Sequence, residues 1–302
     1  MTTNPRYLQP GDTIGLVCPA GYMALEKAET CIKVLEEWGY KVKIGNTLGQ
    51  EAVNYFSGTD EERLADLQQF LDDEEVKAII CARGGYGSSR IIDQLDFTRF
   101  QENPKWIAGY SDITVLLSHI YRNYKIASLH APMAGAFNDE GYNNEYVQSL
   151  KDALEGKKIK YTIDVHELNR KGEAIGELAG GNLSMLTHLV GSESEVKTKG
   201  RILFIEDIGE YYYKVDRMLL QLKRAGKLKN LAGLIVGGFT DMQDTTLKFG
   251  QDVYELIFDK IKEYDYPVCF NFPVGHQTNN YALKVGAGFK LKVGKSKVIL
   301  EE

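Results

Sequence analysis

The chain has 302 residues, which suggests two domains at roughly 100 to 200 residues per domain. Hydrophobic residues make up 43% and charged residues 26%, which excludes a disordered, collagen-like or coiled-coil chain. Lysine and arginine number 36 against 42 acidic residues, so the net charge is −6, and the basic residues are scattered. This pattern argues against nucleic acid or an anionic membrane as the main partner, and it favours a small molecule or a peptide.

The start of the chain predicts a protein that stays in the cytoplasm. Its only apolar stretch is interrupted by Pro19 and Gly21, so we expect neither a signal peptide nor a membrane span. The four cysteines form no CxxC pair, and they are Cys18, Cys31, Cys81 and Cys269. We interpret them as reduced core thiols, and we expect no metal and no other cofactor.

The first half alternates short apolar runs with segments of helical period, which is typical of a parallel sheet covered by helices. We predict strands at Thr13–Cys18, Lys41–Ile44, Val76–Ala82 and Trp106–Ala108. Helices are expected where apolar residues recur at steps of three and four, around 25–35, 64–71 and 113–124. The pattern predicts a Rossmann-like or flavodoxin-like domain over residues 1–157.

Around Glu155 the chain turns polar and basic, and beyond this point strands outnumber helices. We place the domain boundary here and predict a smaller mixed α/β domain over residues 158–302. Apolar runs predict strands at Ile202–Ile205, Leu231–Val236 and Pro267–Val274, and a helix is expected around 215–222. Alternating apolar residues on both sides of Gly294–Ser296 predict a closing hairpin.

A candidate nucleophile lies in the segment WIAGYSDITVLL, residues 106–117, where a buried strand passes directly into an amphipathic helix. Ser111 stands at this turn, where helix N-terminal amides favour a developing oxyanion. The alternative is a serine that only caps the helix, and this segment alone favours the cap. The Gly-x-Ser-x-Gly motif of α/β-hydrolases is not matched, because Ile113 replaces its second glycine.

A nucleophilic serine needs a base, and His276 is the best-placed histidine. It follows an apolar run in PVGHQTNN, residues 273–280, between a glycine and amides that can orient its ring. Working residues of α/β proteins commonly follow strands in this way. A loop histidine bonded only to backbone is an equally good interpretation of this segment.

Two acids, Glu206 and Asp207, end the apolar run in RILFIEDIGE, residues 201–210. An acid in this position can fix the tautomer of an imidazole. Because side chains alternate along a strand, only one of the two can point toward a given site. An ion pair or a helix cap is the alternative role of either acid.

The glycine-rich loop CARGGYGSSR, residues 81–90, also joins a predicted strand to a helix. A backbone N–H near Gly85, together with that of Asp112, would bracket an oxyanion. Nucleotide motifs fit poorly, because Arg90 stands where Gly-x-Gly-x-x-Gly needs a glycine and no lysine precedes the serine. We also assign Arg83 and Tyr86 of this loop to substrate binding.

A further glycine-rich segment, GGNLS at residues 180–184, opens a predicted helix close to the domain boundary. Close backbone approach explains its glycines without any ligand. Asn182 is a candidate either for contacting the substrate or for positioning a loop.

Six segments together resemble the LD-carboxypeptidase family of serine peptidases, the muramoyltetrapeptide carboxypeptidases, which also include the microcin C self-immunity peptidases. The resemblance covers nearly the whole chain, and the segments occur in the family's order. They are GDTIGLVCPA (11–20), RGGYG (83–87), GYSDIT (109–114), GGNLS (180–184), FIEDIGE (204–210) and GHQTN (275–279).

The resemblance implies a flavodoxin-like N-terminal domain that holds the nucleophile Ser111. It also implies a C-terminal domain that holds the orienting acid Glu206 and the base His276, with the active site in the cleft between the domains. The amides of Asp112 and Gly85 would form the oxyanion hole. The implied reaction releases terminal D-alanine from cell-wall tetrapeptides, with a muropeptide as partner, and we also expect a homodimer.

Two alternatives stay open at this point. Gln277 replaces a glycine found in many relatives, and the chain has little room for a substrate-gripping insertion between Ser111 and Glu206. The missing insertion favours cell-wall peptides over peptidyl-adenylate antibiotics of the microcin C type. The second alternative is a non-catalytic α/β protein that binds a nucleotide or sugar through the backbone of Gly84, Gly85 and Gly87.

Overall fold

The computed structural model describes residues 2–50, 55–138 and 141–302, and the chain forms two compact units. The first unit contains the chain up to Lys157 together with Tyr281–Lys284, and the second contains Lys158–Asn280 and Val285–Glu302. The sequence pattern predicted a single division after residue 157. The short segment Tyr281–Lys284 joins the first unit because β11 (Leu283–Val285) lies at the edge of its sheet.

The first unit is built on a sheet with a flavodoxin-like strand order. Next to β11 lie, in spatial order, β5 (Ser128–His130), β4 (Trp106–Gly109), β3 (Val76–Cys81), β1 (Thr13–Val17) and β2 (Lys41–Ile44). The pairs from β5 to β2 are all parallel. The order 2-1-3-4-5 is that of flavodoxin-like folds, which confirms the predicted parallel α/β architecture.

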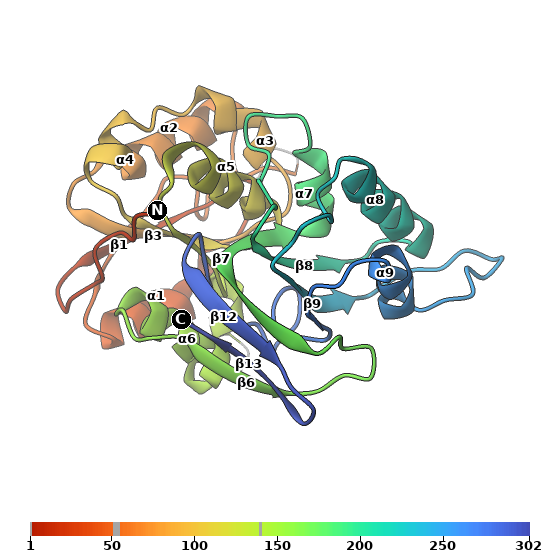
Figure 1. The fold of residues 1–302 in the computed structure, drawn as a ribbon. Helices are drawn as coiled ribbons and strands as arrows, with labels where there is room; N and C mark the ends of the chain where they lie inside the picture. Colours follow the sequence, from red (N-terminus) through yellow and green to blue (C-terminus); the bar gives the residue numbers. More distant parts are fainter. Residues whose placement is uncertain (1, 51–54, 139–140) are drawn as a thin grey trace. The chain divides into compact units, whose positions relative to one another are not determined.

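Helices cover both faces of this sheet. In Figure 1, α2, α3, α4 and α5 lie on one side of β1 and β3, and α1 and α6 lie on the other. Their bounds are α1 Glu29–Glu37, α2 Asp60–Asp72, α3 Ser88–Ile91, α4 Thr98–Glu102, α5 Thr114–Tyr124 and α6 Glu145–Leu154. Short 3₁₀ turns are η1 Leu25–Lys27, η2 Ile92–Gln94, η3 Ser111–Ile113, η4 Ala134–Phe137 and η5 Gly141–Asn143.

The central strands β3 and β4 are apolar along their length because helices bury both of their faces. Every residue of β4 is buried, and β3 is buried except at Lys77. Such strands appear in a sequence as continuous apolar runs, which is why their positions were predictable. Trp106 is fully buried and stacks on Tyr7, with 5.7 Å between the ring centroids.

The second unit contains a mixed sheet, as predicted. Its strands lie in the order β10 (Val268–Cys269), β9 (Gly233–Thr240), β8 (Ile202–Ile208), β7 (Gly172–Asn182), β12 (Gly288–Val293), β13 (Lys297–Glu301) and β6 (Lys160–Asp164). Pairing is parallel from β10 to β7 and antiparallel from β7 to β6. The antiparallel pair β12–β13 confirms the predicted closing hairpin.

The helices of the second unit are α7 (Leu183–His188), α8 (Tyr212–Arg224) and α9 (Val253–Ile261). The helix predicted around 215–222 is therefore present as part of α8. Across both units, none of the described helices combines the length and the apolar character that crossing a membrane requires.

One predicted strand is much shorter than expected. The apolar run Pro267–Val274 forms a strand only at Val268–Cys269. Asn271 adopts a left-handed conformation, with φ of 55°, and Phe270 donates its N–H to the Asn169 side chain instead of to a strand. The chain therefore leaves the sheet early and becomes the loop that carries His276.

Candidate active site

Ser111 lies at a strained turn between a buried strand and a helix. β4 ends at Gly109, and η3 begins at Ser111 itself. Its φ is 65°, a left-handed conformation that costs a residue other than glycine about 1–3 kcal/mol. The residues at the N-cap positions of η3 and α5 are Tyr110 and Ile113, and neither helix has a side-chain cap. Ser111 is therefore not the helix cap that its segment alone favoured.

The glycine-rich loop after β3 passes directly beside this serine. A Cβ built on Gly84 would lie 2.8 Å from Cβ and 3.2 Å from Oγ of Ser111, so only a glycine fits here without a shift. Gly85 follows with a φ of 93°. The two turns are also joined at Asp112, whose buried carboxylate accepts a hydrogen bond of 2.8 Å from the Ser88 N–H.

Replacing Gly84 with alanine is expected to slow the reaction of Ser111 with a serine-directed phosphonate by about 10²-fold, since a shift of about 1 Å at a reacting group costs this much. The matched control is Gly135→Ala, because a Cβ there would meet no described atom within 4 Å apart from its own local backbone and chain neighbours. Labelling rates measured by intact mass test the prediction. Equal rates in the wild type and Gly84→Ala would contradict it.

The remaining predicted residues of this loop have contacts of their own. Arg83 is exposed and donates from Nη1 to the carbonyl oxygen of Tyr22 at 2.6 Å. Tyr86 is 49% exposed, and its ring packs at a tilt against Phe56. Both side chains therefore lie near the surface of the first unit, and their role in substrate binding stays a prediction.

In the second unit, His276 and Glu206 form a direct pair. Glu206 lies in β8 and is completely buried, and the His276 side chain is 14% exposed. Nδ1 of His276 lies 2.7 Å from Oε2 of Glu206, and the His276 backbone N–H donates to the same oxygen at 3.2 Å. Because a carboxylate only accepts, Nδ1 carries the hydrogen and Nε2 is left as the basic nitrogen.

This pairing changes the acid–base behaviour of the ring. Burial alone would lower the pKa of His276, but the hydrogen bond and charge of Glu206, with the charge of Asp207, raise its pKa above the ordinary value. A general base works best when its pKa lies near the pH of the reaction, and the raised pKa of His276 suits proton transfer near neutral pH.

Further polar contacts hold the loop that carries His276. The Gly275 N–H donates to Oδ1 of Asn280 at 2.9 Å, and the Thr240 hydroxyl donates to the His276 carbonyl at 2.7 Å. Gln277 donates from Nε2 to the carbonyl of Phe272 at 3.3 Å, so the glutamine that departs from the family pattern helps to hold the loop. The side-chain amides of this loop were expected to orient the ring, but Asn280 instead holds the loop backbone. No sequence pattern pointed to Thr240.

A glycine also permits the close approach of Glu206 to this loop. Gly275 has a φ of 107°, and a Cβ there would lie 2.6 Å from both Cβ and Cγ of Glu206. Any side chain at this position would push the carboxylate away from the imidazole. The Gly-His sequence therefore has a structural reason in the Glu206–His276 pair.

Asp207 points away from this pair, as strand alternation requires. Its carboxylate accepts hydrogen bonds from Nδ2 of Asn182 at 2.9 Å and from the Ser184 N–H at 3.0 Å. Burial and the neighbouring charge of Glu206 raise the pKa of Asp207 to about 7, although these hydrogen bonds oppose the rise. Asn182 is buried and also caps α7 by accepting from the Met185 N–H, so it links the start of α7 to Asp207 of β8. A substrate contact of Asn182 stays a prediction.

No group of three or more histidine, cysteine, aspartate or glutamate side chains suited to a metal ion occurs in the described parts of the chain. All four cysteines are free and buried. The side chains present are those of acid–base and nucleophilic chemistry: a strained serine in the first unit and a buried imidazole–carboxylate pair in the second.

Comparison with known families agrees with these features. The model of the LD-carboxypeptidase N-terminal domain matches residues 14–131, and that of the LD-carboxypeptidase C-terminal domain matches residues 175–291. Ser111 falls within the first match, and Glu206 and His276 fall within the second.

Among curated proteins, the chain is 36% identical to a probable murein peptide carboxypeptidase of Bacillus subtilis (strain 168), over 98% of this chain and 94% of that protein. It is 30% identical to the murein tetrapeptide carboxypeptidase of Pseudomonas aeruginosa, over 95% and 96% of the two chains.

Among solved structures, a muramoyltetrapeptide carboxypeptidase from Oxalobacter formigenes matches with a TM-score of 0.87 and 29% identity, over 96% of this chain and 98% of that chain. The microcin C7 self-immunity protein MccF matches with a TM-score of 0.88 and 23% identity, over 99% of this chain and 98% of that chain. At this lower identity, the second likeness concerns the fold alone.

Proposed function

The chain belongs to the LD-carboxypeptidase family, and from this premise we propose that Ser111, Glu206 and His276 form its catalytic triad. The protein is a serine-type carboxypeptidase that acts on murein tetrapeptides, and it is an enzyme rather than a non-catalytic ligand-binding protein. The 2.7 Å contact between His276 and Glu206 is the observation that supports the triad most directly.

The proposed reaction begins with attack of the Ser111 oxygen on the carbonyl that joins an L-configured centre of a diamino acid to the terminal D-alanine. His276 takes the hydroxyl proton on Nε2, and Glu206 holds the ring and stabilises the imidazolium. This step requires the hydroxyl and the imidazole to come within hydrogen-bond reach of each other.

The first step produces a tetrahedral intermediate whose oxygen is negative. The backbone N–H groups of Gly85 and Asp112 are proposed to donate to this oxygen, and each such donor is typically worth ~3–4 kcal/mol of transition-state stabilisation. The intermediate collapses, His276 gives its proton to the leaving amine, and D-alanine departs.

The acyl-enzyme that remains is an ester of Ser111 with the shortened peptide. Water attacks the ester while His276 removes a proton from the water. His276 then gives this proton to the Ser111 oxygen as the ester bond breaks, which regenerates the serine and frees the shortened peptide. No step of this cycle uses a metal ion.

This function is tested by incubating the protein with a purified muropeptide tetrapeptide and measuring the mass of the products. We expect loss of one alanine from the tetrapeptide, no cleavage of the analogue that ends in L-alanine, and unchanged rates in EDTA. Strong inhibition by EDTA would favour a metallopeptidase. A peptidyl-adenylate substrate tested in parallel separates the cell-wall function from hydrolysis of microcin C-type antibiotics, and faster cleavage of the adenylate would overturn the substrate assignment.

We further propose that the enzyme works in the cytoplasm as a homodimer, with a domain division near residue 157. A reducing compartment suits its four free, buried cysteines. Light scattering on the purified protein measures the oligomeric state directly.

A further inference from the structure

A buried arginine lies beneath the glycine-rich loop of the first unit. Arg63, in the first turn of α2, has no exposed surface, and its guanidinium lies 4.8 Å from the centroid of the Phe56 ring. A charge removed from water in this way costs several kcal/mol unless polar partners replace the water. The partners of Arg63 therefore show what the charge is used for.

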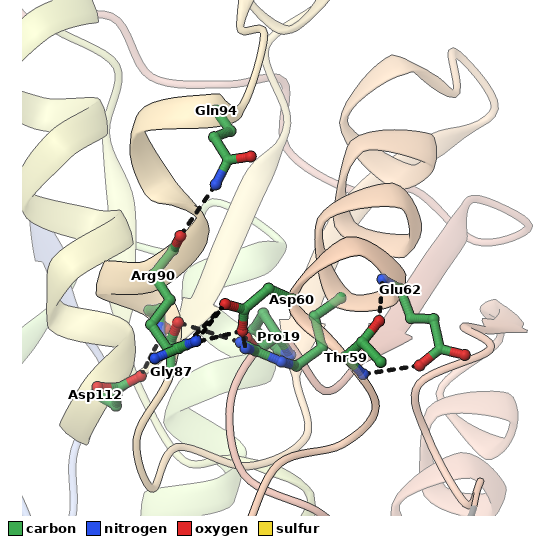
Figure 2. Close-up of polar contacts among 10 residues, drawn as sticks. Pro19, Thr59, Asp60, Glu62, Gly87, Arg90, Gln94 and Asp112 are labelled. Atoms are coloured by element: carbon green, nitrogen blue, oxygen red, sulfur yellow. Dashed lines mark hydrogen bonds and ion pairs between the residues drawn. The ribbon is translucent and has the colours of Figure 1, made fainter. Parts of the chain in front are cut away.

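These partners are one carboxylate and two backbone carbonyls. Nη2 pairs with Asp60, one turn earlier on the same helix. Nη1 donates to the carbonyl oxygen of Pro19 at 2.7 Å and to that of Gly87 at 3.1 Å. Pro19, Asp60 and Gly87 are labelled in Figure 2, where dashed lines mark the contacts between the residues drawn. A single nitrogen thus joins the loop after β1 to the loop after β3.

The first of these bonds holds the segment that sets the direction of the Gly85 N–H. Two residues after Pro19, the Gly21 N–H donates to the Gly84 carbonyl oxygen at 2.9 Å. Because a trans peptide is planar, the N–H of Gly85 points away from the carbonyl of Gly84. Holding the carbonyl of Gly84 on Gly21 therefore aims the Gly85 N–H in the opposite direction.

The second bond holds the other end of the same loop. The residue after Gly87 is Ser88, whose N–H donates to the carboxylate of Asp112 at 2.8 Å. Asp112 directly follows Ser111 and supplies the other proposed oxyanion donor. Both donors of the proposed oxyanion hole thus belong to segments connected through Arg63.

The helix turn that carries Arg63 is capped. The N-terminus of α2 is closed by a capping box, in which Thr59 and Glu62 exchange hydrogen bonds of 2.7 and 3.2 Å, as Figure 2 shows. Asp60 lies within this capped turn and also accepts from Arg90. A capped first turn resists fraying, so the backbone that carries the Arg63 side chain is held in place.

We propose that Arg63 is a positioning residue of the oxyanion hole, which it sets by bonding the carbonyls of Pro19 and Gly87. This inference rests on the proposed function, because it assumes that the amides of Gly85 and Asp112 stabilise the tetrahedral intermediate. Arg63 acts through the backbone and touches none of the reacting atoms.

The chain supplies a matched control in Arg90. Its Nε donates to both oxygens of Asp60 at 2.9 and 2.8 Å, and its guanidinium lies 5.4 Å from the same Phe56 ring. Its side chain is 46% exposed, however, and Arg90 reaches the Gly87 carbonyl only with its backbone N–H, at 3.0 Å, a bond that Arg90→Met leaves in place. The Arg90 side chain therefore shares the carboxylate and the ring with Arg63 but not the two side-chain contacts to loop carbonyls.

The experiment compares Arg63→Lys, Arg63→Met and Arg90→Met in tetrapeptide hydrolysis. We expect kcat to fall on the order of 10²-fold in Arg63→Met with KM nearly unchanged, because a misplaced donor is felt mainly in the transition state. Arg63→Lys keeps the positive charge and can keep a hydrogen bond to one of the two carbonyls. Its kcat should therefore lie between those of Arg63→Met and the wild type. Arg90→Met should stay within about twofold of the wild type, since exposed ion pairs contribute little.

Two further readouts separate positioning from general damage. The acid limb of the pH profile should not move in the Arg63 variants, because they leave His276 and Glu206 unchanged. Affinity for a tetrahedral phosphonate analogue should fall with kcat, whereas affinity for the product peptide should not.

Wild-type kcat in Arg63→Lys and Arg63→Met would overturn the proposal, as would an equal loss in Arg90→Met or a loss confined to KM. If Arg63→Met fails to fold, Arg63→Lys decides the question alone. Failure of the proposed function would look different, since the wild type would then release no alanine from the tetrapeptide, or Ser111→Ala would retain activity, whatever the Arg63 variants do.

Discussion

Ser111→Ala is expected to lower kcat for release of D-alanine by on the order of 10⁶-fold, the loss seen when a serine protease nucleophile is removed. The side-chain oxygen is the atom that forms the acyl-enzyme, and no neighbouring group replaces it. Ser89→Ala, in the adjacent helix α3, is the matched control and should keep full activity. Turnover of the tetrapeptide, measured by mass over long incubations, gives the result.

The strained backbone at Ser111 adds a second expected result. Alanine keeps the left-handed strain at this position, whereas glycine adopts a φ of 65° freely. Ser111→Gly should therefore be as inactive as Ser111→Ala but more stable by about 1 kcal/mol in its free energy of unfolding. Urea denaturation of the two variants measures the difference, and near-normal turnover by either would show that the nucleophile is assigned wrongly.

Glu206→Gln is expected to lower kcat by about 10⁴-fold and to move the acid limb of the pH profile downward. His276 must be neutral to act as a base, so activity is lost as the pH falls through its pKa. Because Glu206 raises the pKa of His276, the wild-type limb should lie above the ordinary value of ~6.5. Without the carboxylate, burial dominates and the pKa of His276 falls, which moves the limb to lower pH.

Asp207→Asn is the matched control for this shift. Asp207 contributes only its charge to the raised pKa of His276, whereas Glu206 contributes both a hydrogen bond and a charge. Its replacement should therefore move the limb in the same direction but less far, with a much smaller loss of kcat. A wild-type profile that stays flat down to about pH 4, far below the ordinary histidine value, would exclude His276 as the base.

The buried strands of the first sheet were predictable because their surroundings are uniform. β1, β3 and β4 are covered on both faces, so their apolar runs mark them to within one residue of their observed ends. β7 was missed because its first half is partly exposed and pairs antiparallel, and its second half is buried and pairs parallel. No single periodicity describes such a strand. The assignment of Tyr281–Lys284 to the first unit depends on contacts distant in the sequence, which no local pattern can predict.

The candidate site shows a similar division. Turn chemistry and resemblance together selected Ser111, Glu206 and His276, but the pairing of Glu206 with His276 joins residues 70 positions apart and depends on the fold. Arg63 left no signal at all, because a charged residue in an amphipathic helix normally lies at the surface. Its burial follows from the two loop carbonyls above it, which are backbone groups and so are independent of side-chain type.

The most direct test of the triad is the site and rate of labelling by a serine-directed phosphonate, followed by peptide mapping. We expect one label per chain, on Ser111, at a rate that follows the acid limb of catalysis and nearly vanishes in His276→Ala. A label on another residue, or an undiminished rate in His276→Ala, would contradict it.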